Sequence, residues 1–186
     1  MLLRTASCSL LALSLLILTS CASTSTESSL LADTPPEIER LAVMLDIPDP
    51  EMRQGMLGAF EQALGAQGIE VVLVETSRDP RPERIAAYGA EAEATAVLVA
   101  GATGMSLRDA YDRAGFDAFG NQRTSREAST QAFEIQLTLY DVASQRRSWT
   151  ATTTTKKKGG DSRAEIGDEI ATSALQAMRD DGLLAP

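Results

Sequence analysis

Short apolar runs alternate with amphipathic segments from about residue 40 onward. Residues 41–47 (LAVMLDI) are almost continuously apolar and stop at Pro48, which is typical of a strand covered on both faces. Asp49 suits a helix cap and Pro50 suits the first helical position. Apolar residues then recur at helical spacing as far as Gly68, at Met52, Met56, Phe60, Ala63 and Leu64. This pattern predicts a strand followed by an amphipathic helix.

The same alternation continues for two further strands. Residues 69–74 (IEVVLV) are rich in β-branched side chains and favour a strand. Residues 82–92 predict an alanine-rich helix, and residues 95–102 (TAVLVAGA) predict a third strand. The order strand, helix, strand, helix, strand implies that the three strands are parallel and joined by right-handed crossovers.

The pattern after residue 132 changes to strict alternation. Residues 133–140 alternate apolar and polar side chains, which indicates a strand with one buried and one solvated face. Residues 141–145 predict a turn, and residues 149–156 (WTATTTTK) predict the antiparallel return strand. Ser162 and Glu165 have the spacing of a capping box, so a C-terminal helix should follow. We therefore predict one α/β (α+β) domain over residues 37–186, with a mixed sheet of about five strands.

Residues 105–130 interrupt these patterns, because they are charged and mixed and keep neither period. They predict a long loop or a flexible hairpin tip. Long connections of this kind often bind partners, which makes the aromatic side chains candidate partner contacts: Tyr111, Phe116 and Phe119. A poorly ordered hairpin end without a binding role is the alternative.

The N-terminal segment has the features of an export signal. Arg4 precedes the apolar residues 10–18, which are too few to span the roughly 30 Å core of a bilayer as a helix. The following Leu18-Thr19-Ser20-Cys21 resembles the lipobox of a bacterial lipoprotein. Leu18, Thr19 and Ser20 would be recognised by the signal peptidase, and cleavage before Cys21 would leave its thiol to be acylated. An ordinary secretory signal cut near Ala22 is the alternative.

Residues 1–20 are thus interpreted as a signal peptide and residues 21–36 as the lipidated N-terminus with a flexible tether. The tether is rich in Ser and Thr and closes with Pro35 and Pro36. A coil of this length has an r.m.s. reach of about 20 Å, enough to hold a domain clear of the lipid headgroups.

The amino-acid composition limits the reactions and partners that the chain could have. The chain has no histidine, and its two cysteines are Cys8 in the signal and Cys21, so processing would leave neither a free thiol nor a disulfide. These facts exclude a His- or Cys-based enzyme, and we expect no catalytic residue and no cofactor. The net charge of −9 disfavours nucleic acid as a partner.

Two clusters of charged residues are candidates for binding a metal ion or anionic lipid. Asp161, Glu165, Asp168 and Glu169 lie near the predicted start of the last helix, where acidic residues complement the helix dipole, and we expect no metal there. Residues 156–160 (KKKGG) could touch anionic lipid, but a solvated turn is the favoured interpretation.

The layout as a whole resembles a known domain. Three alternating strands and helices, a hairpin and a final helix, on a small exported lipoprotein, are similar to the domain shared by the N-terminal part of the translocation protein TolB, the curli secretion lipoprotein CsgG and the exopolysaccharide-export lipoprotein PelC. The resemblance covers about residues 40–184, and its most specific part is the hairpin, with Asp141 at the turn and Trp149 opening the return strand. Relatives often have a glycine in this turn, where Gln145 or Arg146 stands here. The resemblance implies a structural or docking part of an envelope assembly and no catalytic residue.

Two functions follow as expectations. The first is a lipid-anchored docking component of a cell-envelope assembly, bound to the membrane through Cys21 and to envelope proteins. Ala22 after Cys21 resembles the signal for outer-membrane sorting, so the periplasmic face of the outer membrane is the expected location. The second is a monomeric ligand-binding lipoprotein that uses residues 105–130. If both crossover helices cover one sheet face, the other face would be an apolar surface suited to self-association.

Overall fold

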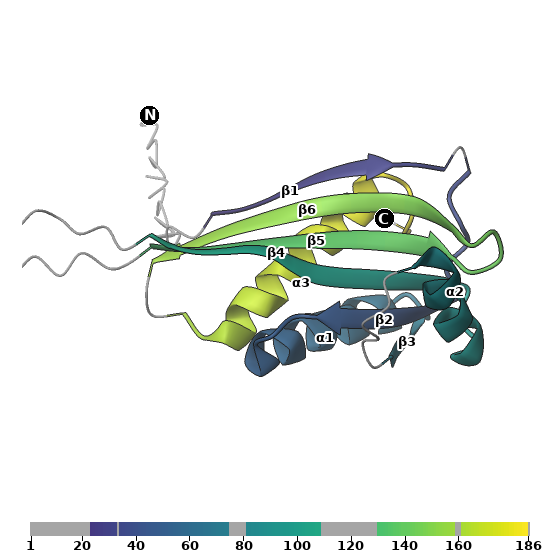
Figure 1. Cartoon of the computed structure of the whole chain (residues 1–186), viewed down its shortest axis with the longest axis horizontal. Helices are drawn as coiled ribbons and strands as arrows, with labels where there is room; N and C mark the ends of the chain where they lie inside the picture. The colour runs from purple at the N-terminus through teal and green to yellow at the C-terminus, as the bar shows by residue number, and fades with distance from the viewer. Residues whose placement is uncertain (1–22, 33, 75–80, 109–129, 159–160, 186) are drawn as a thin grey trace, which may run out of the picture.

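The computed structural model describes residues 23–32, 34–74, 81–108, 130–158 and 161–185. They form one mixed sheet packed against helices, with the strand order β1-β6-β5-β4-β2-β3 (Figure 1). Along the chain the elements are β1 (Ser23–Leu30), β2 (Arg40–Asp46), α1 (Pro50–Gly65), β3 (Glu70–Leu73), α2 (Pro82–Glu91), β4 (Ala96–Arg108), β5 (Thr130–Asp141), β6 (Arg146–Lys158) and α3 (Arg163–Asp180). The predicted α/β class and mixed sheet are confirmed.

One half of the sheet is parallel, as predicted. β2 pairs in parallel with β3 on one side and with β4 on the other. α1 begins where expected, because the Asp49 carboxylate accepts hydrogen bonds from the amides of Glu51 and Met52 at 3.0 and 3.1 Å. These bonds satisfy donors that the first turn of a helix cannot pair internally.

The other half is antiparallel and contains the predicted hairpin. β5 pairs with β4 and with β6, and Leu139 lies opposite Trp149. Gln145 in the turn has a φ of 57°, a left-handed conformation that a glycine adopts without strain. Trp149 is fully buried and donates its indole N–H to the Asp181 carboxylate at 2.7 Å, which ties the hairpin to the end of α3.

The prediction of a flexible tether is wrong for Ser23–Leu30, which form β1 at the edge of the sheet. β1 pairs antiparallel with β6 from Ser23 opposite Lys156 to Leu30 opposite Trp149, so the sheet has six strands among the described residues. Sequence patterns missed this strand because its side chains are almost all polar. A main-chain ladder needs no apolar side chain, and polar residues are common on edge strands.

The predicted loop is shorter than expected. β4 continues to Arg108 and β5 begins at Thr130, so residues 105–108 and Thr130 belong to strands. Tyr111, Phe116 and Phe119 lie outside the described residues, and their role as partner contacts stays a prediction.

Helices cover both faces of the sheet. On β2, Leu41, Val43 and Leu45 face the larger core, which contains α1 and α3, whereas Ala42 and Met44 face a smaller cluster beneath α2. The sequence-based argument for an uncovered apolar face therefore fails. Beyond α2, that face carries polar side chains of β5 and β6, including Glu134, Gln136 and Thr152.

α1 and α3 approach each other closely because glycines lie at their crossing. A Cβ on Gly55 would lie 2.0 Å from the carbonyl oxygen of Ala164 in α3, and a Cβ on Gly167 would lie 2.2 Å from the carbonyl oxygen of Met52 in α1. Each helix thus presses its backbone against the other where the partner lacks a side chain. The contact sets the position of α3 on the sheet.

We expect Gly55→Ala and Gly167→Ala each to lower the free energy of unfolding by about 1–3 kcal/mol, because the two backbones must separate. Gly58→Ala is the matched control, since it lies in the same helix and a Cβ there would meet nothing within 4 Å. It should raise stability by about 0.5–1 kcal/mol through helix propensity. Urea unfolding measures all three, and equal effects at Gly55 and Gly58 would contradict the close crossing.

Candidate functional site

Four strand ends meet at one end of the sheet, where the chain enters the domain. Ser23 lies opposite Lys156, while Thr130 lies opposite both Lys158 and Arg108. The start of β1, the end of β6, the start of β5 and the end of β4 are therefore neighbours (Figure 1). We call this region the anchor end, because Ser23 follows Cys21 by two residues. Cys21, Leu18, Thr19 and Ser20 lie outside the described residues, so lipidation stays a prediction.

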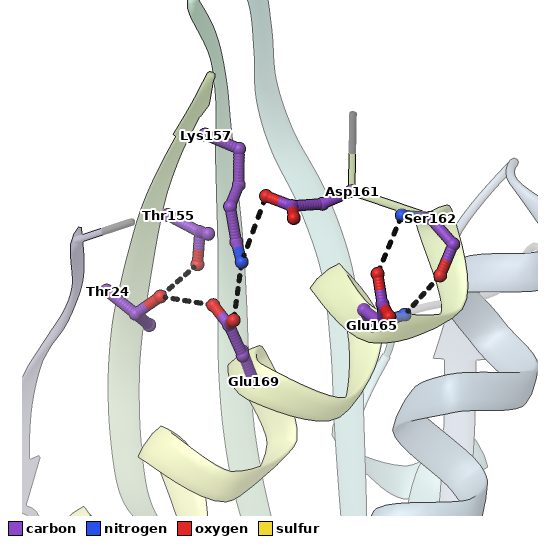
Figure 2. A network of polar contacts seen from close by, with 7 residues as sticks. All are labelled: Thr24, Thr155, Lys157, Asp161, Ser162, Glu165 and Glu169. Carbon is purple, nitrogen blue, oxygen red and sulfur yellow. Dashed lines mark hydrogen bonds and ion pairs between the residues drawn. The ribbon is translucent and has the colours of Figure 1, made fainter. Parts of the chain in front are cut away.

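Lys157 is the central residue of the anchor end. Its side chain is 6% exposed and its ammonium binds the Glu169 carboxylate of α3 and the Asp161 carboxylate, the latter at 3.3 Å (Figure 2). The predicted solvated turn is therefore wrong for Lys157. It follows Thr153 and Thr155 on the buried side of β6, and strand alternation in the sequence was the signal that could have found it.

The same carboxylate connects α3 to β1. Thr24 donates to the second oxygen of Glu169 at 3.3 Å and lies 3.1 Å from the hydroxyl of Thr155 (Figure 2). One turn further along α3, the hydroxyl of Thr26 lies 2.7 Å from that of Ser173 and 2.8 Å from that of Thr153. β1 is thus held by side chains on β6 and α3 as well as by its main-chain ladder.

Opposing effects act on the pKa of Lys157. Burial alone would lower it, but the hydrogen bonds and the charges of Glu169 and Asp161 together outweigh burial, so the pKa lies above the ordinary 10.5. The ammonium form is therefore the one that the folded anchor end stabilises. Such a charged cluster holds β6, α3 and the segment between them together.

The acidic residues near α3 have structural partners. Ser162 accepts from the amide of Glu165 at 3.2 Å, and the Glu165 carboxylate accepts from the amide of Ser162 at 2.9 Å (Figure 2). This is the predicted capping box, which is confirmed. Across the described residues, no three His, Cys, Asp or Glu side chains are grouped so that they could hold a metal ion.

Comparisons with known proteins bear on the fold. No protein-family model matches the sequence, and no curated protein matches it significantly. Two similar solved structures are a PelC dodecamer from Paraburkholderia phytofirmans (14% identity, TM-score 0.52) and a variant of that dodecamer (15%, 0.51), each covering 81% of this chain and 95% of the other. Lipoprotein GNA1162 from Neisseria meningitidis is 13% identical with a TM-score of 0.44, covering 76% of this chain and 98% of its own.

The likeness to the two PelC structures shows the fold. The chain has a PelC-like fold, which confirms that part of the resemblance seen in the sequence, whereas the likeness to TolB and CsgG stays a prediction. Of the helices in the described part of the chain, none combines the length and apolar character needed to cross a bilayer.

Lys157→Met should lower the free energy of unfolding at neutral pH by about 1–2 kcal/mol, because charge-assisted bonds are lost while Glu169 regains water. Because the folded-state pKa of Lys157 is raised, its contribution is fully present below the unfolded value and disappears as the pH rises through the folded value. The stability difference between wild type and Lys157→Met should therefore shrink above about pH 10.5.

Lys156→Met is the control, since Lys156 is adjacent and exposed. Tyr140, whose pKa is raised by burial against the opposing charge of Arg147, titrates similarly in all three proteins and cancels in the comparison. Urea unfolding between pH 7 and 11.5 measures the effect. A pH-independent difference between wild type and Lys157→Met would contradict the assignment.

Proposed function

We propose that this protein is a lipid-anchored structural or docking component of a secretion- or export-type assembly of the bacterial cell envelope. The lipobox ending at Cys21 supports the anchor, and the PelC-like fold supports a place in the envelope. The proposed location is the periplasmic face of the outer membrane, for which Ala22 after Cys21 is the sequence support. The proposed role is not enzymatic, since holding a partner in place requires no reacting group.

The observation that carries this proposal is the short distance between Cys21 and the sheet. β1 begins at Ser23, so an acylated Cys21 would lie within roughly 7 Å of chain from the first residue of a paired strand. A flexible tether of this length would let the distance between the domain and the membrane vary by about 20 Å. An anchor joined directly to β1 instead holds the anchor end at the lipid surface and fixes the orientation of the sheet.

This orientation determines which parts of the domain would face the membrane and which would face away from it. The chain leaves β4 at Arg108 and returns to β5 at Thr130, both at the anchor end. Tyr111, Phe116 and Phe119 lie between these two positions in the sequence, and we propose them as partner contacts. The β5–β6 turn lies at the opposite end and would point away from the membrane, toward other envelope proteins.

Self-association belongs to the same proposal. The similar PelC structures are described as dodecamers, and we propose that this chain also forms a homo-oligomer. Anchors held close to a membrane restrict each copy to one orientation, which lowers the entropic cost of assembly into a ring or array. Crosslinking of detergent-extracted protein that yielded only monomers, without envelope partners, would exclude the docking role.

Cys21→Ala should remove the protein from the membrane fraction, because no thiol remains to take an acyl chain. The variant should be recovered as soluble protein or as precursor with an uncleaved signal peptide. Cell fractionation combined with metabolic labelling by an alkynyl fatty acid measures both location and lipid. Cys8→Ala is the control and should leave both unchanged. Persistent labelling of Cys21→Ala would contradict acylation at this position.

A linker insertion tests the short anchor separately from the lipid. A 12-residue Gly-Ser linker between Ala22 and Ser23 should preserve acylation but reduce site-specific crosslinks to neighbouring copies and envelope partners several-fold, because orientation is lost. The same linker appended after Pro186 is the control. If the inserted linker leaves the crosslinks intact, close anchoring does not matter for assembly.

A further inference from the structure

A cavity of about 490 Å³ opens beside the carboxyl end of β2 and the middle of β4. Its walls are apolar, formed by Ile47 after β2, Met52 of α1, and Phe133 and Ile135 of β5. Asp49, Thr103 and Arg163 add polar groups at its border. Cavities of this size, mostly apolar with few polar groups, are typical of small-molecule sites.

The topology places this cavity at the carboxyl end of a parallel strand, β2. From β2 the chain crosses through α1 to β3 on one side, and then through α2 to β4 on the other side of β2. α1 follows β2 on one face of the sheet and α2 follows β3 on the other, so the chain diverges at the carboxyl ends of β2 and β3. The cavity opens at the carboxyl end of β2, and open α/β sheets bind ligands outside the carboxyl ends of their strands.

A β-bulge lies at the same place. The register of β4 against β5 shifts between Ala102 and Gly104, which leaves Thr103 without a paired residue. Thr103 donates its hydroxyl toward the carbonyl and the carboxylate of Glu134 at 3.3 and 2.9 Å. Bulges of this kind often occur beside functional sites, where they redirect a strand. Here the bulge brings Ala102 and Thr103 to the mouth of the cavity.

Arg163 supplies an unsatisfied donor. It is the first residue of α3, its Nε lies 3.6 Å from the Asp49 carboxylate, and its guanidinium carbon lies 4.9 Å from the centre of the Phe133 ring. The side chain as a whole is 32% exposed, yet Nη1 is buried and has no hydrogen-bond partner within the described part of the structure. Asp49 already supplies a counter-charge, so Nη1 lacks a hydrogen-bond acceptor and not an ion partner.

We propose that this cavity binds a small amphipathic carboxylate. Its carboxylate would accept from Nη1 of Arg163, and its apolar body would pack between Met52, Ile135 and the ring of Phe133. Guanidinium nitrogens only donate, so the ligand must present an acceptor. The positive charge of the guanidinium favours an anion over a neutral acceptor, while Asp49, which also lines the cavity, is held by the first turn of α1 and by Arg163. The site is independent of the proposed docking role.

The test uses the full-length protein in lipid nanodiscs, with 3-(4-fluorophenyl)propionate as the probe and its neutral amide as the matched ligand. Fluorine NMR line broadening, corrected with empty nanodiscs, reports binding. The carboxylate should bind saturably and at least tenfold more tightly than the amide. Equal affinity of carboxylate and amide, or no saturable binding by the folded protein, would overturn the proposal.

Variants locate the binding. Arg163→Gln should weaken carboxylate binding at least tenfold, whereas Arg53→Gln, at an exposed arginine of α1 outside the cavity, should leave it unchanged. Ala102→Leu keeps the guanidinium but fills the exposed mouth, and it should also abolish binding. Circular dichroism confirms the fold of each variant. Unchanged affinity in both Arg163→Gln and Ala102→Leu would place the ligand elsewhere and overturn the assignment.

Discussion

The close crossing of α1 and α3 is the constraint on which the polar features of the domain depend. Gly55 and Gly167 let each helix touch the backbone of the other, and this contact fixes α3 against the sheet. α3 in turn carries Glu169 to Lys157 and Arg163 to the cavity, while the residue after it, Asp181, reaches Trp149. A small shift of α3 would alter all three contacts together, because each depends on one side chain projecting from the same rigid element.

The parts of the fold that bury apolar side chains were predictable from the sequence. The parallel strands are nearly continuous apolar runs, and the hairpin alternates clearly, so periodicity identified both. β1 was not predicted, because main-chain pairing and hydroxyl contacts stabilise it and neither leaves an apolar period in the sequence. The burial of Lys157 was not predicted for a related reason. Among three successive lysines, only the register of β6 determines which one lies on its buried side.

The candidate sites differ in the same way. Cys21 is predicted from sequence alone, because a lipobox is a contiguous motif that needs no fold to be recognised. The cavity beside Arg163 draws its walls from β4, β5, α1, α3 and the residues after β2, which are far apart in the sequence. Neither spacing nor composition reports that Nη1 of Arg163 lacks an acceptor, since this depends on which groups the tertiary packing places around it.

The pairing of β1 with β6 also orders events in time. Thr26 contacts Thr153, which lies 127 positions later in the sequence. β1 therefore cannot pair until β6, near the end of the chain, is available. If the chain is exported as proposed, β1 would therefore stay unpaired until most of the domain has been translocated. In that interval the proposed cleavage and acylation at Cys21 would take place next to an unpaired strand. Closure of β1 onto β6 would then join the finished anchor directly to the sheet.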